Sequence, residues 1–196
     1  MTIHDLQLPI RTARLTLRPF AAGDFAAYAD YQSRDEVYRY LYAQAPAGEA
    51  LAERFRQVLD APFAHDGDIL RLAVARDEDG ALLGEVLLKL SSQAALQGEV
   101  GYVFHPAYAG KGYATEAAGA MIDFGFSRLG FHRIFARLDA ANAGSVGVVE
   151  RLGLRREAHL IQNDRFNGVW GNEFVYAVLA AEWTARQVLA PGSVNS

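Results

Sequence analysis

The chain of 196 residues contains no cysteine. This absence excludes a disulfide framework, a zinc ion held by thiolates and a thiol nucleophile. The sequence also has no excess of basic residues, because 19 Lys and Arg stand against 23 Asp and Glu, a formal net charge of −4. Proteins that bind nucleic acid through its phosphates usually carry a strong basic excess, so we expect no nucleic-acid partner.

Long apolar runs are missing as well. None approaches the roughly 18 residues that a membrane-spanning helix needs. The segment 1–16 carries acidic and basic side chains and lacks the apolar stretch of a signal peptide. We therefore expect a cytoplasmic protein without a membrane partner. The spacing of His65, His132 and His159 does not suggest metal ligands, and we expect no metal.

Length and composition are those of one globular domain. The hydrophobic share of 51% and the charged share of 21% are ordinary for such a protein. A chain of this size can bury roughly 70% of its unfolded surface, so it needs no disulfide or metal to fold. We expect a single domain over residues 1–190, followed by a flexible tail of small and polar residues over 191–196.

The hydrophobic periodicity changes along the chain, with strands in a run, then strands alternating with helices, then a hairpin. Asp24 is a good N-cap for the first helix, and Asn167-Gly168 is a strong hairpin turn. This order predicts a mixed sheet with helices packed on it. The predicted strands cover 14–18, 69–76, 81–91, 99–104, 132–139, 154–162 and 172–179, and the predicted helices follow Asp24 and cover 47–64, 113–129 and 144–152.

The most informative stretch is the loop between the strand that stops at Pro106 and the helix that begins at Tyr113. Small residues allow a ligand to approach its backbone closely. The first-turn amides of a helix have no partner within the helix, and the helix dipole favours an anion there. Residues 110–115 are therefore predicted to form a phosphate cradle, to which Lys111 adds a positive charge.

Two common nucleotide motifs do not fit this loop. A P-loop needs four residues between its first Gly and Gly-Lys-Ser/Thr, whereas one residue separates Gly110 from Gly112. The dinucleotide pattern G-x-G-x-x-G needs a glycine where Thr115 stands.

The segment 109–114 resembles motif A of the GNAT superfamily of acyl-CoA-dependent N-acyltransferases, Q/R-x-x-G-x-G/A. It departs from this pattern at Ala109, where Gln or Arg is usual. Residues 12–19, TARLTLRP, look like the T-x-R-L-x-L-R-P opening of the RimJ/RimL-like (ribosomal-protein-alanine N-acetyltransferase-like) branch. Residues 138–154 look like that branch's N-x-x-S-x-x-v-x-e-x-l-G-f segment. The resemblance covers roughly residues 12–186.

This resemblance implies the GNAT fold, an α+β fold of three layers. Its mixed, mostly antiparallel sheet of about seven strands is flanked by helices, and two strands, here 99–104 and 132–139, splay apart to hold acyl-CoA. Backbone amides near Val103 and Phe104 would hold the pantetheine arm and polarise the thioester carbonyl. Asn142 can also be read as a helix N-cap. The implied cofactor-binding residues are Tyr102, Val103, Phe104, Gly110, Lys111, Gly112, Tyr113, Ala114, Thr115, Asn142 and Ser145.

The resemblance also implies direct attack of an amine on the thioester, which agrees with the lack of cysteine. Glu99 matches the general base of the histone-acetylating members, although a solvated carboxylate is the alternative interpretation. Many relatives place a proton-donating Tyr where Val149 stands, so Ser145, another tyrosine or water has to serve. Tyr38, Glu85 and Trp170 are weak candidates for the acceptor site.

The sequence thus predicts an N-acetyltransferase that moves an acetyl group from acetyl-CoA to a primary amine, on a protein N-terminus or a small molecule. One alternative is another acyl-CoA, such as succinyl-CoA. A second is a CoA-binding regulatory module with little catalysis. The protein is expected to be a monomer or a homodimer.

Overall fold

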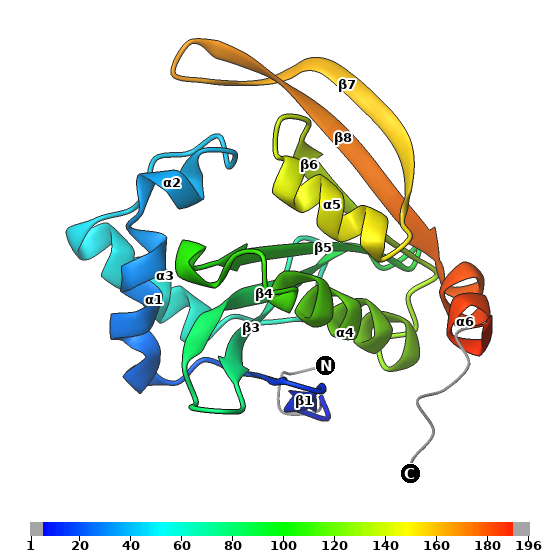
Figure 1. The fold of residues 1–196 in the computed structure, drawn as a ribbon, viewed down its shortest axis with the longest axis horizontal. Coiled ribbons are helices and arrows are strands. Elements are labelled where there is room, and N and C mark those ends of the chain that lie inside the picture. Colours follow the sequence, from blue (N-terminus) through cyan, green and yellow to red (C-terminus); the bar gives the residue numbers. More distant parts are fainter. Residues whose placement is uncertain (1–5, 190–196) are drawn as a thin grey trace.

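The computed structural model describes residues 6–189, and within them one sheet of eight strands (Figure 1). The strand order is β1-β2-β3-β4-β5-β6-β8-β7. All neighbouring strands are antiparallel except β5 and β6. The strands are β1 (Ile10–Arg11), β2 (Leu15–Arg18), β3 (Ile69–Arg76), β4 (Leu82–Ser92), β5 (Gln97–Phe104), β6 (Arg133–Asp139), β7 (Arg155–Phe166) and β8 (Val169–Leu179).

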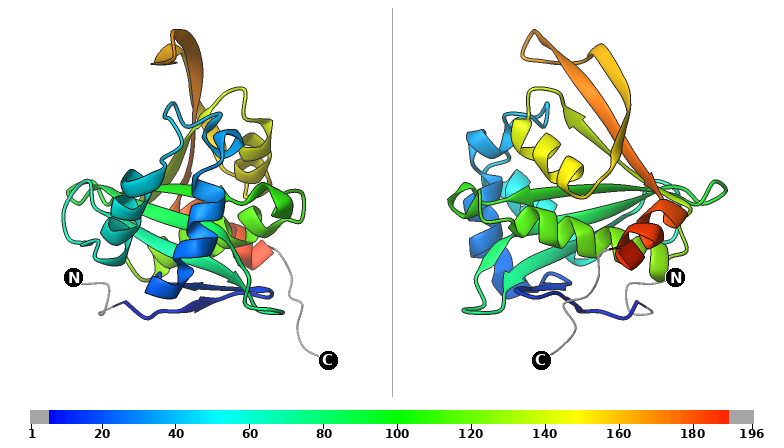
Figure 2. Two further views of the ribbon diagram at one scale, coloured as in Figure 1. Left: turned by 90° about the vertical axis from the view of Figure 1, so that its left-hand side faces the viewer. Right: turned by 45° about the vertical axis from the view of Figure 1, so that its right-hand side comes forward.

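Helices cover both faces of the sheet, which gives the three layers (Figure 2). On one face pack α4 (Tyr113–Ser127) and α5 (Ala143–Arg151), and on the other pack α1 (Phe25–Gln32), α2 (Asp35–Tyr38) and α3 (Gly48–Leu59). The last helix, α6 (Ala180–Leu189), follows β8 directly. In β3, Leu72 and Val74 belong to the core under α4, whereas Ala73 between them belongs to the core under α1 and α3. Because side chains alternate between the two faces of a strand, β3 contributes residues to both cores.

The predicted mixed, mostly antiparallel sheet is confirmed, with one strand more than the seven expected. The additional strand is β1, whose two residues are too few to produce a periodic signal. The tail predicted over 191–196 lies outside the described residues. None of the helices within residues 6–189 is long and apolar enough to cross a membrane.

Some element boundaries differ from the predicted ones. The helix predicted over 47–64 ends at Leu59, three residues before Pro62, because the residue before a proline disfavours helical geometry. Asp24 does occupy the N-cap of α1, but its side chain makes no cap bond to that helix. Its carboxylate instead accepts the Ala21 amide at 2.8 Å and pairs with Arg18 at 2.7 Å. The Asp24 carboxylate thereby stabilises the turn that precedes α1.

The β7–β8 hairpin is longer than predicted and projects beyond the body of the molecule (Figure 1). Its strands continue as far as the predicted turn, where Asn167 and Gly168 have φ values of 49° and 82°. Positive φ at both central residues is what a type I′ turn requires. The turn was therefore recognised from the sequence, whereas the polar strands beside it were not.

The strands β5 and β6 separate, as expected. They pair only from Gln97 to Glu99 on β5. Beyond Glu99, β5 remains bonded to β4 through Phe104, and β6 remains bonded to β8. The facing edges of β5 and β6 beyond this point have no strand partner, so backbone amides and carbonyls are left for a ligand.

Candidate functional site

A cavity of about 1090 Å³ occupies the opening between β5 and β6. Its walls come from β5, the 106–115 loop, the end of β6, the start of α5 and the segment around α2. The residues that line the cavity thus come from segments spread between positions 36 and 151 of the sequence. The predicted residues that line it are Glu99, Tyr102, Val103, Phe104, Gly110, Lys111, Gly112, Tyr113, Ala114, Thr115, Asn142 and Ser145.

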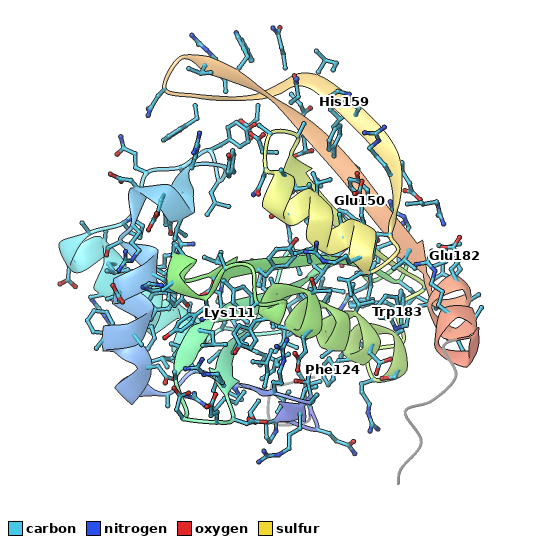
Figure 3. All side chains as sticks on the ribbon, in the orientation of Figure 1. Lys111, Phe124, Glu150, His159, Glu182 and Trp183 are labelled. Carbon is cyan, nitrogen blue, oxygen red and sulfur yellow. The ribbon has the colours of Figure 1, made fainter. Side chains whose placement is uncertain are left out.

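At one end of the cavity, the glycine loop leads into α4. Gly110 and Gly112 have φ values of 76° and 80°, a region that side chains disfavour. Gly112 is the N-cap of α4, and no side chain caps this helix. The first-turn amides of α4 are therefore available to an anion. Lys111 lies beside them at the start of the helix (Figure 3), 5.8 Å above the Tyr108 ring.

A second cation stands at the same loop. Arg151 of α5 lines the cavity, and its Nε donates to Thr115 Oγ1 at 3.3 Å. No local sequence pattern predicts this contact, because Thr115 and Arg151 are 36 positions apart. The positive charges of Lys111 and Arg151 suit a phosphate-bearing ligand.

The middle of the cavity runs along β5 and the start of α5. Asn142 caps α5, and its Oδ1 accepts the Ser145 amide at 3.1 Å. The N-cap interpretation is confirmed, and a contact with a ligand stays a prediction. The Tyr102 hydroxyl donates to the Ser145 carbonyl at 3.2 Å. Burial raises the pKa of Tyr102 to about 12, although this hydrogen bond opposes the rise. Tyr102 therefore keeps its proton at neutral pH.

Glu99 lies where β5 and β6 separate. Its two carboxylate oxygens accept from Nε and Nη2 of Arg137 on β6, at 2.9 and 3.4 Å. The Glu99 side chain is 17% exposed. Solvent or a substrate can therefore reach it, but must share its oxygens with Arg137. The role of Arg137 was not predicted, because the side chains of Glu99 and Arg137 meet only through the register of β5 and β6.

Further carboxylates surround this end of the cavity. Burial raises the pKa of the Glu173 carboxyl, and the charges of Glu99 and Asp164 raise it further, against the opposing charge of Arg137. Asp139 lines the cavity and accepts a hydrogen bond from the Tyr42 hydroxyl. Glu99 and Asp139 thus place two carboxylates in the wall at this end of the cavity, where Arg137 supplies an opposing positive charge.

Tyr42 brings the segment after α2 across to β8. A Cβ built at Gly171 would lie 1.8 Å from the Tyr42 oxygen, so the ring occupies the space that a side chain would need. Tyr42 itself has φ of 50°. Its contact with Asp139 spans 97 positions of sequence, which explains why no local pattern indicated it.

The three residues predicted for an acceptor site, Tyr38, Glu85 and Trp170, do not line the cavity. Glu85 is fully buried and binds Arg71 and the Tyr31 hydroxyl. Tyr38 is buried and donates to Gln32. Trp170 is 55% exposed on the projecting hairpin. Their assignment to an acceptor site stays a prediction.

No cluster of three or more His, Cys, Asp or Glu side chains suitable for a metal ion occurs within the part of the chain that the structure describes.

The family described as "Acetyltransferase (GNAT) domain" matches residues 14–155. The uncharacterized N-acetyltransferase YnaD of Bacillus subtilis (strain 168) is 32% identical over 175 residues, which are 89% of this chain and 98% of YnaD.

Solved structures have the same fold. The acetyltransferase (GNAT family) from Bacillus anthracis superposes with a TM-score of 0.81 at 28% identity, over 89% of this chain and 100% of that one. Spermidine N-acetyltransferase from Vibrio cholerae, in complex with CoA and spermine, superposes with a TM-score of 0.76 at 22% identity, over 88% of this chain and 99% of that one. At this last level of identity the likeness extends to the fold alone.

Proposed function

The chain belongs to the GNAT family of acetyltransferases, and from this premise we propose that it transfers the acetyl group of acetyl-CoA to a primary amine. The observation that carries the proposal is the opening between β5 and β6, which ends at an uncapped helix N-terminus preceded by Gly110 and Gly112. This arrangement offers a phosphate site and a row of strand amides along one continuous cavity.

Each part of acetyl-CoA has a counterpart in the cavity. The amides of residues 112–115 would hold the pyrophosphate, with Lys111 and Arg151 beside it. The free edge of β5 near Phe104 would hold the pantetheine arm and polarise the thioester carbonyl, whereas the backbone of Val103 faces β4. The bound CoA in the Vibrio cholerae structure supports this choice of ligand.

The reaction forms a C–N bond and breaks the C–S bond of the thioester. We propose that Glu99, directly or through water, takes the proton that the attacking amine loses. Tyr102 would donate a proton to the departing thiolate, since its hydroxyl faces the start of α5 inside the cavity. Val149, where many relatives place a tyrosine, is 1% exposed in the core and has no proton to give.

For the acceptor, the carboxylates around Arg137 favour a cationic amine. The spermine in the Vibrio cholerae complex is such a molecule. A protein N-terminus stays a candidate, because residues 12–19 and 138–154 resemble the RimJ/RimL-like branch. We further propose one domain over residues 1–190, since one sheet joins all the strands between Ile10 and Leu179. The cytoplasmic location and the monomeric or homodimeric state stay predictions.

The test is release of free thiol from acetyl-CoA in the presence of spermidine, of simple diamines and of peptides with a free N-terminus. The proposal predicts release above the hydrolysis background with at least one of these amines. Succinyl-CoA, run in parallel, tests the acyl group, and the engagement of Arg137 by Glu99 predicts slower turnover with it. Binding of CoA without any release above background would support a regulatory module instead.

A further inference from the structure

The N-terminal segment with the T-x-R pattern lies beside the start of α4, more than 100 positions later in sequence. Thr12 Oγ1 donates to Glu116 Oε1 at 2.6 Å, and the Arg14 amide donates to the same oxygen at 2.9 Å. The Arg14 guanidinium binds the other oxygen through Nε and Nη2, each at 2.7 Å. Glu116 thus has both of its oxygens engaged by one short segment.

Arg14 reaches the glycine loop as well. Its Nη1 donates to the Lys111 carbonyl at 3.1 Å, and its guanidinium lies 4.6 Å from the centroid of the Tyr113 ring. Arg14 therefore contacts the residues on both sides of Gly112. A guanidinium can do this because its donors form a rigid planar array, which a lysine ammonium does not have.

Two features of the loop disfavour the binding of an anion, and these contacts counter both. Glycine-rich backbone is conformationally free, and ordering it when a ligand binds costs entropy. Glu116 also places a negative charge in the first turn of the helix that is proposed to take a phosphate. Burial alone would raise the pKa of Glu116, but the hydrogen bonds from Thr12 and Arg14 outweigh burial and hold it below its usual range.

We infer that Arg14 and Glu116 are positioning residues for the coenzyme A pyrophosphate. Together they hold the 110–115 loop in its binding conformation, and Arg14 neutralises the carboxylate that would otherwise repel the phosphate. This inference rests on the proposed function, because it takes the loop to be the pyrophosphate site. It gives the T-x-R pattern a role in cofactor binding, although neither Thr12 nor Arg14 lines the cavity.

The test measures the dissociation constants of CoA and of its phosphorylated head, 3′-phospho-ADP, by calorimetry. Arg14→Ala should weaken both by the same factor, about tenfold, equivalent to about 1.4 kcal/mol. Equal losses locate the effect at the phosphorylated head, which contains the pyrophosphate, and exclude the pantetheine arm. Arg11→Ala is the matched control, because Arg11 is a nearby arginine whose side chain bonds to Thr16 instead of the loop. Its affinities should equal those of the unaltered protein.

Substitution of Glu116 separates positioning from direct contact with the phosphate. If Arg14 acts through the loop, Glu116→Ala releases Arg14 and weakens CoA binding, and Arg14→Ala/Glu116→Ala binds no more weakly than Arg14→Ala alone. Glu116→Gln keeps an oxygen for Thr12 and Arg14 and should retain most of the affinity. If Arg14 were itself a phosphate ligand, Glu116→Ala would free its charge and tighten binding.

Tighter binding by Glu116→Ala, or unchanged binding by Arg14→Ala, would overturn the inference while leaving the proposed function intact. Failure of the unaltered protein to bind CoA or 3′-phospho-ADP would overturn both. Thermal unfolding without ligand checks that each variant is folded at the temperature of the titration.

Discussion

The carboxylate of Glu99 lies where the two central strands part, and its pairing with Arg137 makes a specific prediction. Glu99→Gln keeps the size of the side chain and removes its ability to take a proton. We expect turnover to fall about 100-fold, the lower end of the range for a positioned base, with no change in the dissociation constant of CoA. Glu78→Gln is the control, because Glu78 lies in the turn between β3 and β4. Full activity of Glu99→Gln would contradict a role as base.

The Tyr102 hydroxyl gives a second prediction for a single residue. Tyr102→Phe removes the proton proposed for the thiolate and should lower turnover about 100-fold. Since the pKa of Tyr102 is raised to about 12, the hydroxyl stays protonated from neutral to mildly alkaline pH. The ratio of unaltered to variant rates should therefore stay constant across that range. A ratio that falls as the pH rises from neutral would show that Tyr102 loses its proton earlier, against the structure.

Single residues also show how far the sequence could predict the site. The glycine loop and Asn142 were found because their contacts are local in sequence. The contacts Arg137–Glu99, Tyr42–Asp139 and Arg14–Glu116 were not predicted, because the two partners lie 38, 97 and 102 positions apart. Such contacts depend on strand register and helix placement, which hydrophobic periodicity does not encode.

The attachment of α1 to the sheet depends on a buried charge. Glu85 of β4 is fully buried, and it accepts from the Tyr31 hydroxyl of α1 at 2.9 Å and pairs with Arg71 of β3. Arg71→Met should destabilise the protein by about 3–5 kcal/mol, because it leaves a buried carboxylate without its counterion. Removing both charges in Arg71→Met/Glu85→Leu should recover much of this loss. Chemical denaturation measures both, and an Arg71→Met variant as stable as the unaltered protein would contradict the account.

Element prediction succeeded where periodicity is strong. The helix α4 and the strands β3 to β6 were located within a few residues, because each buries one face or both against a core. The outer half of the β7–β8 hairpin was missed, since its residues are mostly exposed on both sides and show no alternation. The helix predicted over 47–64 is too long at its C-terminal end. Apolar residues continue beyond Leu59, but the helix ends there, before Pro62.

At the scale of the whole molecule, the order of strands and helices predicted the layers, and the separation of β5 and β6 positions the cavity. At the Asp139 end of the cavity, the segment after α2, the end of β6 and the start of β8 come together only in the folded chain. We propose that the cavity between β5 and β6 as a whole holds acetyl-CoA, with the pyrophosphate at Gly112.

Thermal unfolding with and without acetyl-CoA tests this placement of the ligand, with ATP and NAD as controls. Ligand at 100 times its dissociation constant adds about 2.7 kcal/mol to the free energy of unfolding. For a domain of this size, that raises the midpoint by about 5–11 °C. Gly112→Val should lose the shift, whereas Gly80→Val, a glycine with a similar φ of 71° in the turn between β3 and β4, should keep it.

We expect the midpoint to rise with acetyl-CoA and not with ATP or NAD, and we expect no rise in Gly112→Val. No rise with acetyl-CoA, or an equal rise in Gly112→Val, would contradict this placement.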